Sequence, residues 1–255
     1  MTNSFDLDLP FDEDAMKRDI ERDLAAATPE NLVNGPFLSA YRAWVDDGIV
    51  PEKSPEDLLI ENGVPKRAIG LSMTAMMLRD IYIAEFGFSV PTAAFIDLMK
   101  AFGPILEVGA GQGYLSQVLR HAGIDAIATD ANPGHMEAVR ARATSEENLP
   151  ARERQLPVEI LNAEDAIKTY PGRTILCSWP DYQSDWITKA AGGMAKGQRL
   201  VVIGEGYGGC TGEDGLFDLV ETGIFEFDRA HQDLQDRAIW SFPAIHDQLR
   251  IFRKI

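Results

Sequence analysis

A glycine-rich turn between two short apolar segments constrains this chain more than any other feature. Residues 104–130 read PILEVGAGQGYLSQVLRHAGIDAIATD. The pattern predicts a strand at 104–108, a turn with Gly109, Gly111 and Gly113, a helix, and a second strand at 126–129 that leads to Asp130. Glycines let a backbone turn sharply and approach a ligand closely, and the free N–H groups at a helix start attract negative charge.

The acid at Asp130 indicates what such a turn binds. An acidic side chain about 20 residues beyond the turn, at the end of the second strand, suits the hydroxyls of a ribose. The segment therefore predicts a nucleoside-containing cofactor. A dinucleotide site uses G-x-G-x-x-G, but here the third glycine comes one residue early and Tyr114 stands where that pattern has glycine. This spacing disfavours NAD and FAD.

The stretch from Glu107 to Gly113, E-V-G-A-G-Q-G, resembles motif I of the class I S-adenosylmethionine (SAM)-dependent methyltransferases. The resemblance implies that SAM is the cofactor, that Glu107 lies near its methionine end and that Asp130, followed by Ala131, holds its ribose. The three glycines of the turn (Gly109, Gly111 and Gly113) complete this part of the expected cofactor site.

The third predicted strand, at 158–161, is followed by N-A-E-D. The methyltransferase resemblance implies that Glu164 or Asp165 lies close to the adenine amine. A second interpretation needs no cofactor: Asn162 caps a helix and the two acids favour its first turn.

Strands and helices alternate after Pro104, which predicts an α/β fold with a doubly wound, mostly parallel sheet. Further strands are expected at 174–178 and 199–204. Two final strands, at 224–229 and 248–254, are expected to form an antiparallel hairpin with only a loop between them. Seven strands with such a hairpin match the Rossmann-like class I methyltransferase fold, and NAD-binding domains usually lack this insertion.

Three regions follow from these patterns. Residues 1–30 form an acidic, partly disordered arm, and residues 31–103 a helical N-terminal extension or lid with apolar residues at helical spacing. Residues 104–255 form the SAM-binding, methyltransferase-like domain.

The loop after the fourth predicted strand reads S-W-P-D-Y, residues 178–182. It resembles the D/N/S-P-P-Y/F motif of amino-group methyltransferases, which faces the transferable methyl group. Ser178, one proline and Tyr182 are kept, whereas Trp179 intrudes and Asp181 replaces the second proline. The resemblance implies that Ser178 and Trp179 contact the cofactor and that Asp181 and Tyr182 act on the acceptor, with Asp181 as a general base or cation anchor. A proline turn with a packed tryptophan explains the segment equally well.

The fifth predicted strand runs into G-E-G-Y-G-G-C-T-G-E, residues 204–213. With W-P-D at 179–181 and I-H-D-Q-L at 245–249, this loop resembles a largely uncharacterised family of methyltransferase-like proteins, over about residue 80 to the end. That family carries W-P-P, G-G-C-T-G and I-H-D-x-L at these places, and it implies no substrate. Glu205 is expected on the acceptor side. Cys210 and His246 are more simply read as packing and hydrogen-bonding residues than as a nucleophile and a base.

The overall charge argues against nucleic acid as a partner. The 255 residues carry a formal net charge of −16, whereas affinity for a phosphate backbone comes largely from Lys and Arg. No apolar run reaches the roughly 20 residues of a membrane span, and the acidic N-terminus does not resemble a signal peptide. Two cysteines, Cys177 and Cys210, make no disulfide framework. A cytoplasmic protein without a metal site is expected.

The sequence thus predicts a SAM-dependent methyltransferase that acts on a small molecule or protein acceptor. Two other functions stay open: a non-catalytic SAM-binding or scaffold protein, and a nucleotide-dependent oxidoreductase. Within the transferase class, aminopropyl transfer from decarboxylated SAM stays open as a variant.

Overall fold

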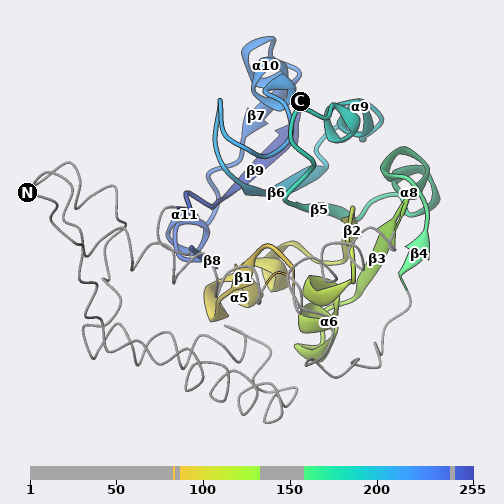
Figure 1. Cartoon of the computed structure of the whole chain (residues 1–255), viewed down its shortest axis with the longest axis vertical. Coiled ribbons are helices and arrows are strands. Elements are labelled where there is room, and N and C mark those ends of the chain that lie inside the picture. Colours follow the sequence, from red (N-terminus) through yellow and green to blue (C-terminus); the bar gives the residue numbers. More distant parts are fainter. Residues whose placement is uncertain (1–82, 84–86, 133–157, 242–244) are drawn as a thin grey trace, which may run out of the picture.

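The computed structural model describes residues 83, 87–132, 158–241 and 245–255. A seven-stranded sheet lies between two layers of helices (Figure 1). Its strands are β2 (Ile105–Val108), β3 (Ala126–Asp130), β4 (Glu159–Ile160), β5 (Thr174–Ser178), β6 (Arg199–Gly204), β7 (Phe225–Phe227) and β9 (Gln248–Lys254). The helices are α5 (Ala93–Phe102), α6 (Tyr114–His121), α8 (Ala163–Thr169), α9 (Trp186–Gly192), α10 (Gly215–Glu221) and α11 (Gln232–Gln235).

The strand order is β4-β3-β2-β5-β6-β9-β7. The first five strands are parallel, and β9 is antiparallel to both of its neighbours, β6 and β7. This confirms the predicted α/β class and the mostly parallel, seven-stranded sheet, with the last two predicted strands, β7 and β9, as an antiparallel pair.

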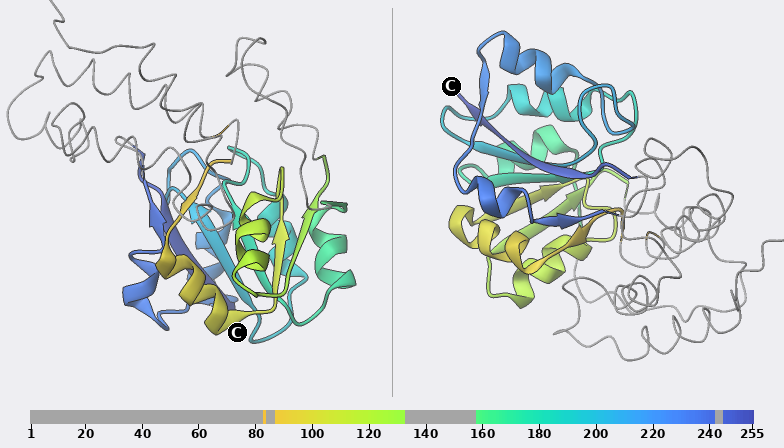
Figure 2. Two further views of the ribbon diagram at one scale, coloured as in Figure 1. Left: turned by 90° about the horizontal axis from the view of Figure 1, so that it is seen from below. Right: turned by 90° about the vertical axis from the view of Figure 1, so that its left-hand side faces the viewer.

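The two helical layers bury different side chains of the same strands. One layer contains α5, α6 and α11 and packs on Ile105, Val201 and Ile251, among others. The other contains α8, α9 and α10 and packs on Leu106, Ile175 and their neighbours (Figure 2). Successive strand residues point to opposite faces, so strands buried on both faces read as continuous apolar runs. All four residues of β2 are buried for this reason.

The chain reverses its winding direction between β2 and β5. The helix after β2, α6, lies in one layer, and the helix after β5, α9, lies in the other. At such a switch point the loops after the two strands separate and leave a crevice at the carboxyl edge of the sheet. The topology therefore puts the glycine turn after β2 beside the loop after β5.

One predicted connection is wrong. The segment between the last two strands is not only a loop, because it contains α11 and a short strand, β8 (Ile239–Trp240). β8 pairs antiparallel with β1 (Val90–Pro91) in a second, two-stranded sheet. Thr92 reinforces this pairing: its hydroxyl donates to the carbonyls of Arg237 and Ala238, at 2.6 and 3.0 Å. Two-residue strands carry too little periodicity to be recognised in a sequence.

The predicted acidic arm at 1–30 and residues 31–82 of the predicted helical extension lie outside the described residues. The end of that extension is described, and there α5 packs on the sheet. None of the helices in the described ranges has the length and apolar character that crossing a bilayer requires.

Replacing Leu98 with alanine should lower the free energy of unfolding by about 2–5 kcal/mol, because this α5 side chain is fully buried and truncation leaves a cavity. Lys100→Ala on the exposed side of the same helix is the matched control and should change it by less than about 0.5 kcal/mol. Urea unfolding followed by circular dichroism measures both. Equal effects of the two substitutions would contradict the packing of α5.

Candidate functional site

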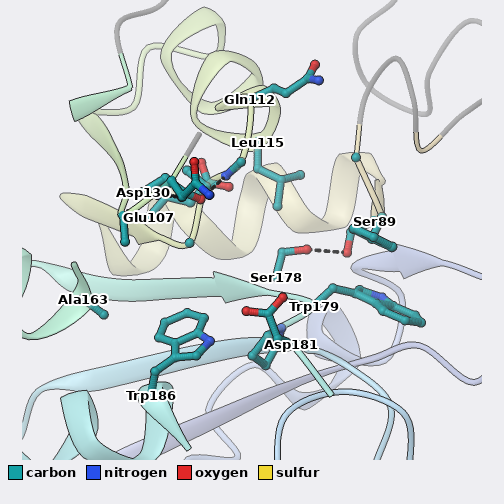
Figure 3. Close-up of a pocket in the computed structure, with 18 of the residues that line it drawn as sticks. Ser89, Glu107, Gln112, Leu115, Asp130, Ala163, Ser178, Trp179, Asp181 and Trp186 are labelled. Atoms are coloured by element: carbon teal, nitrogen blue, oxygen red, sulfur yellow. Dashed lines mark hydrogen bonds between the residues drawn. The ribbon is translucent and has the colours of Figure 1, made fainter. Parts of the chain in front are cut away.

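A cavity of about 680 Å³ opens at the carboxyl edge of the sheet, at the switch point between β2 and β5 (Figure 3). Its volume is within the range of small-molecule sites. The glycine turn, the end of β3, the start of α8, the loop after β5 and residues 87–89 contribute to its walls. Three carboxylates line it, from Glu107, Asp130 and Asp181, and none of the described lining residues is Lys, Arg or His.

The glycine turn has a backbone that other residues rarely adopt. Gly109 and Gly113 have φ values of +64° and +77°, in the left-handed region that favours glycine. Space is also limited at Gly109, where a Cβ atom would lie 2.8 Å from Cη2 of Trp186. The turn is therefore fixed by conformation and by close packing, and α6 starts directly after it.

Asp130 joins the end of β3 to this turn. One of its carboxylate oxygens accepts the N–H of Gly111 at 2.7 Å, and the other accepts the N–H of Asn132 at 2.6 Å. Each carboxylate oxygen has a second acceptor position. The side chain can therefore hold the glycine turn and still accept hydroxyl donors from the cavity.

Glu107 is an ionisable side chain in the interior of the sheet. It is 2 % exposed, and Oε2 accepts the backbone N–H of Ser116 in α6 at 2.9 Å. Burial raises the pKa of Glu107 from 4.5 to about 7, and the charge of Asp130 adds to the rise, although the hydrogen bond from Ser116 opposes it. The three carboxylates also act on a common neighbour: burial, then Glu107, Asp181 and Asp130, raise the pKa of the Cys177 thiol well above its usual range.

The loop after β5 is held from three sides. Trp179 has a φ of 51°, which is uncommon for a residue with a side chain. Its ring stacks on Phe88 with centroids 5.1 Å apart and an interplanar angle of 14°. Its indole N–H donates to Asp247 at 2.8 Å, while the hydroxyls of Ser178 and Ser89 are hydrogen bonded at 2.7 Å.

The glycine-rich loop after β6 closes the same region. Gly212 donates its N–H to the carbonyl of Pro180, and its own carbonyl accepts the N–H of Gln183, both at 2.8 Å. Segments 179–181, 204–213 and 245–249, which the sequence analysis singled out, thus meet around one loop. Cys210 from the second segment lines the cavity.

Most of the predicted cofactor-side residues line the cavity: Glu107, Gly109, Gly111, Asp130, Ala131, Ser178 and Trp179. Asp181 and Tyr182 of the predicted acceptor side do so as well. Gly113, Glu164, Asp165 and Glu205 are not among the lining residues.

Hydrogen bonds explain two of these positions. Asn162 caps α8 by accepting the N–H of Asp165 at 2.9 Å, and its amide donates to the Asp165 carboxylate, so this segment makes the cap that the sequence allowed. Glu205 turns back into its own loop, where it accepts the N–H of Cys210 at 2.7 Å and raises the pKa of that thiol.

Sequence reasoning missed several lining residues. Trp186 lies at the start of α9, seven positions beyond Trp179, and no motif marks it. Phe88 and Ser89 precede the glycine turn by about twenty residues, and they reach the cavity through the pairing of β1 with β8. Asn132 and Asn162 follow the ends of β3 and β4, and that position in the sequence could have signalled a site.

Within the described ranges, no group of three or more His, Cys, Asp or Glu residues has an arrangement that could hold a metal ion.

Glu107→Gln should remove a pH-dependent loss of stability. The folded-state pKa is raised from 4.5 to about 7, so the folded protein holds a proton there that the unfolded chain has already lost. Stability therefore falls as pH rises from about 4.5 through 7, by about 3 kcal/mol for this group. The free energy of unfolding of the variant should be similar to that of the wild type at pH 5 and higher than that of the wild type at pH 8.

Urea unfolding of both proteins at the two pH values measures this difference, and other titrating groups largely cancel in the comparison. A stability gap between the proteins that does not change with pH would contradict the burial of the Glu107 charge.

Comparison with known proteins gives structural similarity alone. No protein-family model and no curated protein sequence matches the chain. Similar solved structures include TehB from Haemophilus influenzae, at 14 % identity over 69 % of this chain and 67 % of that one, with a TM-score of 0.37. An rRNA methylase from Streptococcus thermophilus matches at 14 % identity over 63 % and 94 %, with a TM-score of 0.36. An O-methyltransferase family 2 protein from Planctomyces limnophilus, in complex with apigenin, matches at 12 % identity over 78 % and 67 %, with a TM-score of 0.39.

Proposed function

We propose that this protein is a SAM-dependent methyltransferase whose cofactor binds in the cavity at the switch point. One observation carries the proposal: the Asp130 carboxylate at the tip of β3 is hydrogen bonded to the Gly111 N–H of the glycine turn. A cofactor that lies against the backbone of this turn would place its ribose hydroxyls beside the Asp130 carboxylate, which could accept their hydrogen bonds.

The charges around the cavity favour SAM over a dinucleotide. SAM carries a sulfonium and an ammonium group against one carboxylate, so it is a net cation, whereas NAD carries a pyrophosphate. Glu107, Asp130 and Asp181 face the cavity, and its described lining has no basic side chain. A cation gains from this field and an anion is repelled. The same field disfavours nucleic acid as the acceptor.

The residues of the cavity fit the parts of such a cofactor. Asp130 and Ala131 are proposed at the ribose. Glu107, buried beneath the glycine turn, is proposed near the methionine end, where its ionised form would attract an ammonium group. Ser178 and Trp179 are proposed to contact the cofactor, on the side of the cavity where the acceptor would bind. Glu164 and Asp165 are retained only as outer groups near the adenine, because Asn162 and Ala163 are the residues of that segment that line the cavity.

SAM supplies a methyl group that its sulfonium already activates. The protein then has to hold a nucleophile in line with that group, exclude water and accept a proton where the nucleophile carries one. Asp181 and Tyr182 line the cavity on the β5 side and are proposed for these tasks. Glu205 is proposed as a positioning residue of the loop after β6, since its carboxylate is engaged by the Cys210 N–H.

Further parts of the proposal follow from the motifs. The contacts among segments 179–181, 204–213 and 245–249 support the likeness to the methyltransferase-like family with the G-G-C-T-G loop.

Two free thiols, at Cys177 and Cys210, suit the proposed cytoplasmic location. The acceptor is proposed to be a small molecule or a protein side chain.

Asp130→Asn should weaken the binding of S-adenosylhomocysteine at least about tenfold, because the amide keeps one acceptor oxygen and loses the other along with the charge. Isothermal titration calorimetry of the full chain with SAM, S-adenosylhomocysteine and NAD measures this.

Asp97→Asn is the matched control, because Asp97 is an exposed acid of α5 outside the cavity lining, and the affinity of this variant should equal that of the wild type. A thermal melt of each variant checks that it is folded. Binding of NAD without either adenosyl ligand would favour an oxidoreductase. The absence of adenosyl-ligand binding at millimolar concentration would refute the methyltransferase proposal.

A further inference from the structure

Asp181 is a carboxyl side chain of the loop after β5 that lines the cavity. Within the described ranges, no hydrogen-bond donor or basic group engages its carboxylate, whereas Asp130 accepts two backbone N–H groups and Glu107 accepts one. The latter two carboxylates are also assigned to the cofactor in the proposed function. Asp181 is therefore the carboxylate of the cavity that is left for a second ligand.

The backbone around Asp181 is held in an unfavourable conformation. Trp179 and Gln183 both have positive φ values, 51° and 56°, and Asp181 lies midway between them. Residues in such conformations persist only where the surrounding structure enforces them. Here the Trp179–Asp247 hydrogen bond and the two backbone hydrogen bonds of Gly212 provide that restraint. The loop is fixed with its carboxylate in the cavity wall.

Aromatic rings flank this carboxylate. In Figure 3 Asp181 lies between Trp186 and Trp179, and Glu107 and Asp130 lie above it in that view. The ring of Tyr182, which is 62 % exposed, adds a third aromatic group to the lining. Indole and phenol faces attract organic cations, and a carboxylate beside them adds a charge-assisted hydrogen bond.

We propose that Asp181 and the rings of Trp186 and Tyr182 form an acceptor subsite that binds an organic amine in its cationic form. This rests on the proposed function and names the substrate class of the same cavity. An ammonium nitrogen has to lose a proton before it can act as a nucleophile, and Asp181, the cavity carboxylate not assigned to the cofactor, is placed to accept that proton. The amine nitrogen would then bond to the methyl carbon as the methyl–sulfur bond of SAM breaks, with S-adenosylhomocysteine as the leaving group. A neutral alcohol of the same shape would lose the ionic hydrogen bond, and a carboxylate would be repelled.

Three matched probes test the charge preference directly: tyramine, the alcohol 4-hydroxyphenethyl alcohol and the acid 3-(4-hydroxyphenyl)propionate. Each is titrated calorimetrically into the full chain saturated with S-adenosylhomocysteine. The wild type should bind tyramine roughly tenfold more tightly than the alcohol, the acid should bind most weakly, and added salt should reduce the difference.

Asp181→Asn should bring tyramine and the alcohol to within about twofold of each other while the affinity for S-adenosylhomocysteine stays unchanged. Asp185→Asn is the charge-matched control, because Asp185 pairs with Lys189 at 2.6 Å and does not line the cavity, and it should keep the wild-type preference.

The outcomes separate the two proposals. Three results would overturn the amine subsite alone, provided that S-adenosylhomocysteine binds. They are equal binding of tyramine and the alcohol, no tyramine binding at millimolar concentration, and a preference for tyramine that survives Asp181→Asn. Loss of S-adenosylhomocysteine binding in the wild type overturns the proposed function and the subsite with it.

Discussion

The arrangement of the cavity depends on a carboxylate buried within a parallel sheet. Glu107 has β3 on one side and β5 on the other, and its Oε2 holds the first turn of α6 through Ser116. An isolated buried charge is costly, so the raised pKa of Glu107 is the expected response to this position. The benefit is geometric: one side chain ties the central strand to the helix that follows the glycine turn, and the turn between them has little freedom left.

The outer parts of the site are tied to this centre by hydrogen bonds between distant segments. Asp130 connects β3 to the turn, Ser89 connects the segment before α5 to the end of β5, and Asp247 connects the start of β9 to Trp179. The walls of the cavity thus come from segments that are far apart in the chain. Its shape depends on the tertiary fold as a whole, as expected where loops are positioned by a rigid sheet.

The sequence contains enough to predict the sheet and the centre of the site. Fully buried strands appear as continuous apolar runs, and the glycines with Asp130 mark the place where the chain turns beneath a ligand. It does not contain enough for the rest. β8 has only two residues, too few to show the alternation of apolar and polar residues that marks a strand. Trp186 lines the cavity because of the direction in which α9 leaves the loop after β5, and no sequence motif indicates that direction. At the end of β4 the sequence pattern marks the correct strand end but does not show which side chains face the cavity. Asn162 and Ala163 line it, whereas the acids of α8 do not.

The two cysteines differ in a way that is useful beyond their chemistry in the cell. Cys177 is fully buried in β5, whereas Cys210 is exposed and lines the cavity. A thiol reagent therefore has a single accessible target in the folded protein, since the chain contains two cysteines in all. The nearby Glu205 raises the pKa of that thiol, so labelling proceeds faster in mildly alkaline buffer. A fluorophore or spin label at this position sits at the wall of the cavity and reports on whatever enters it.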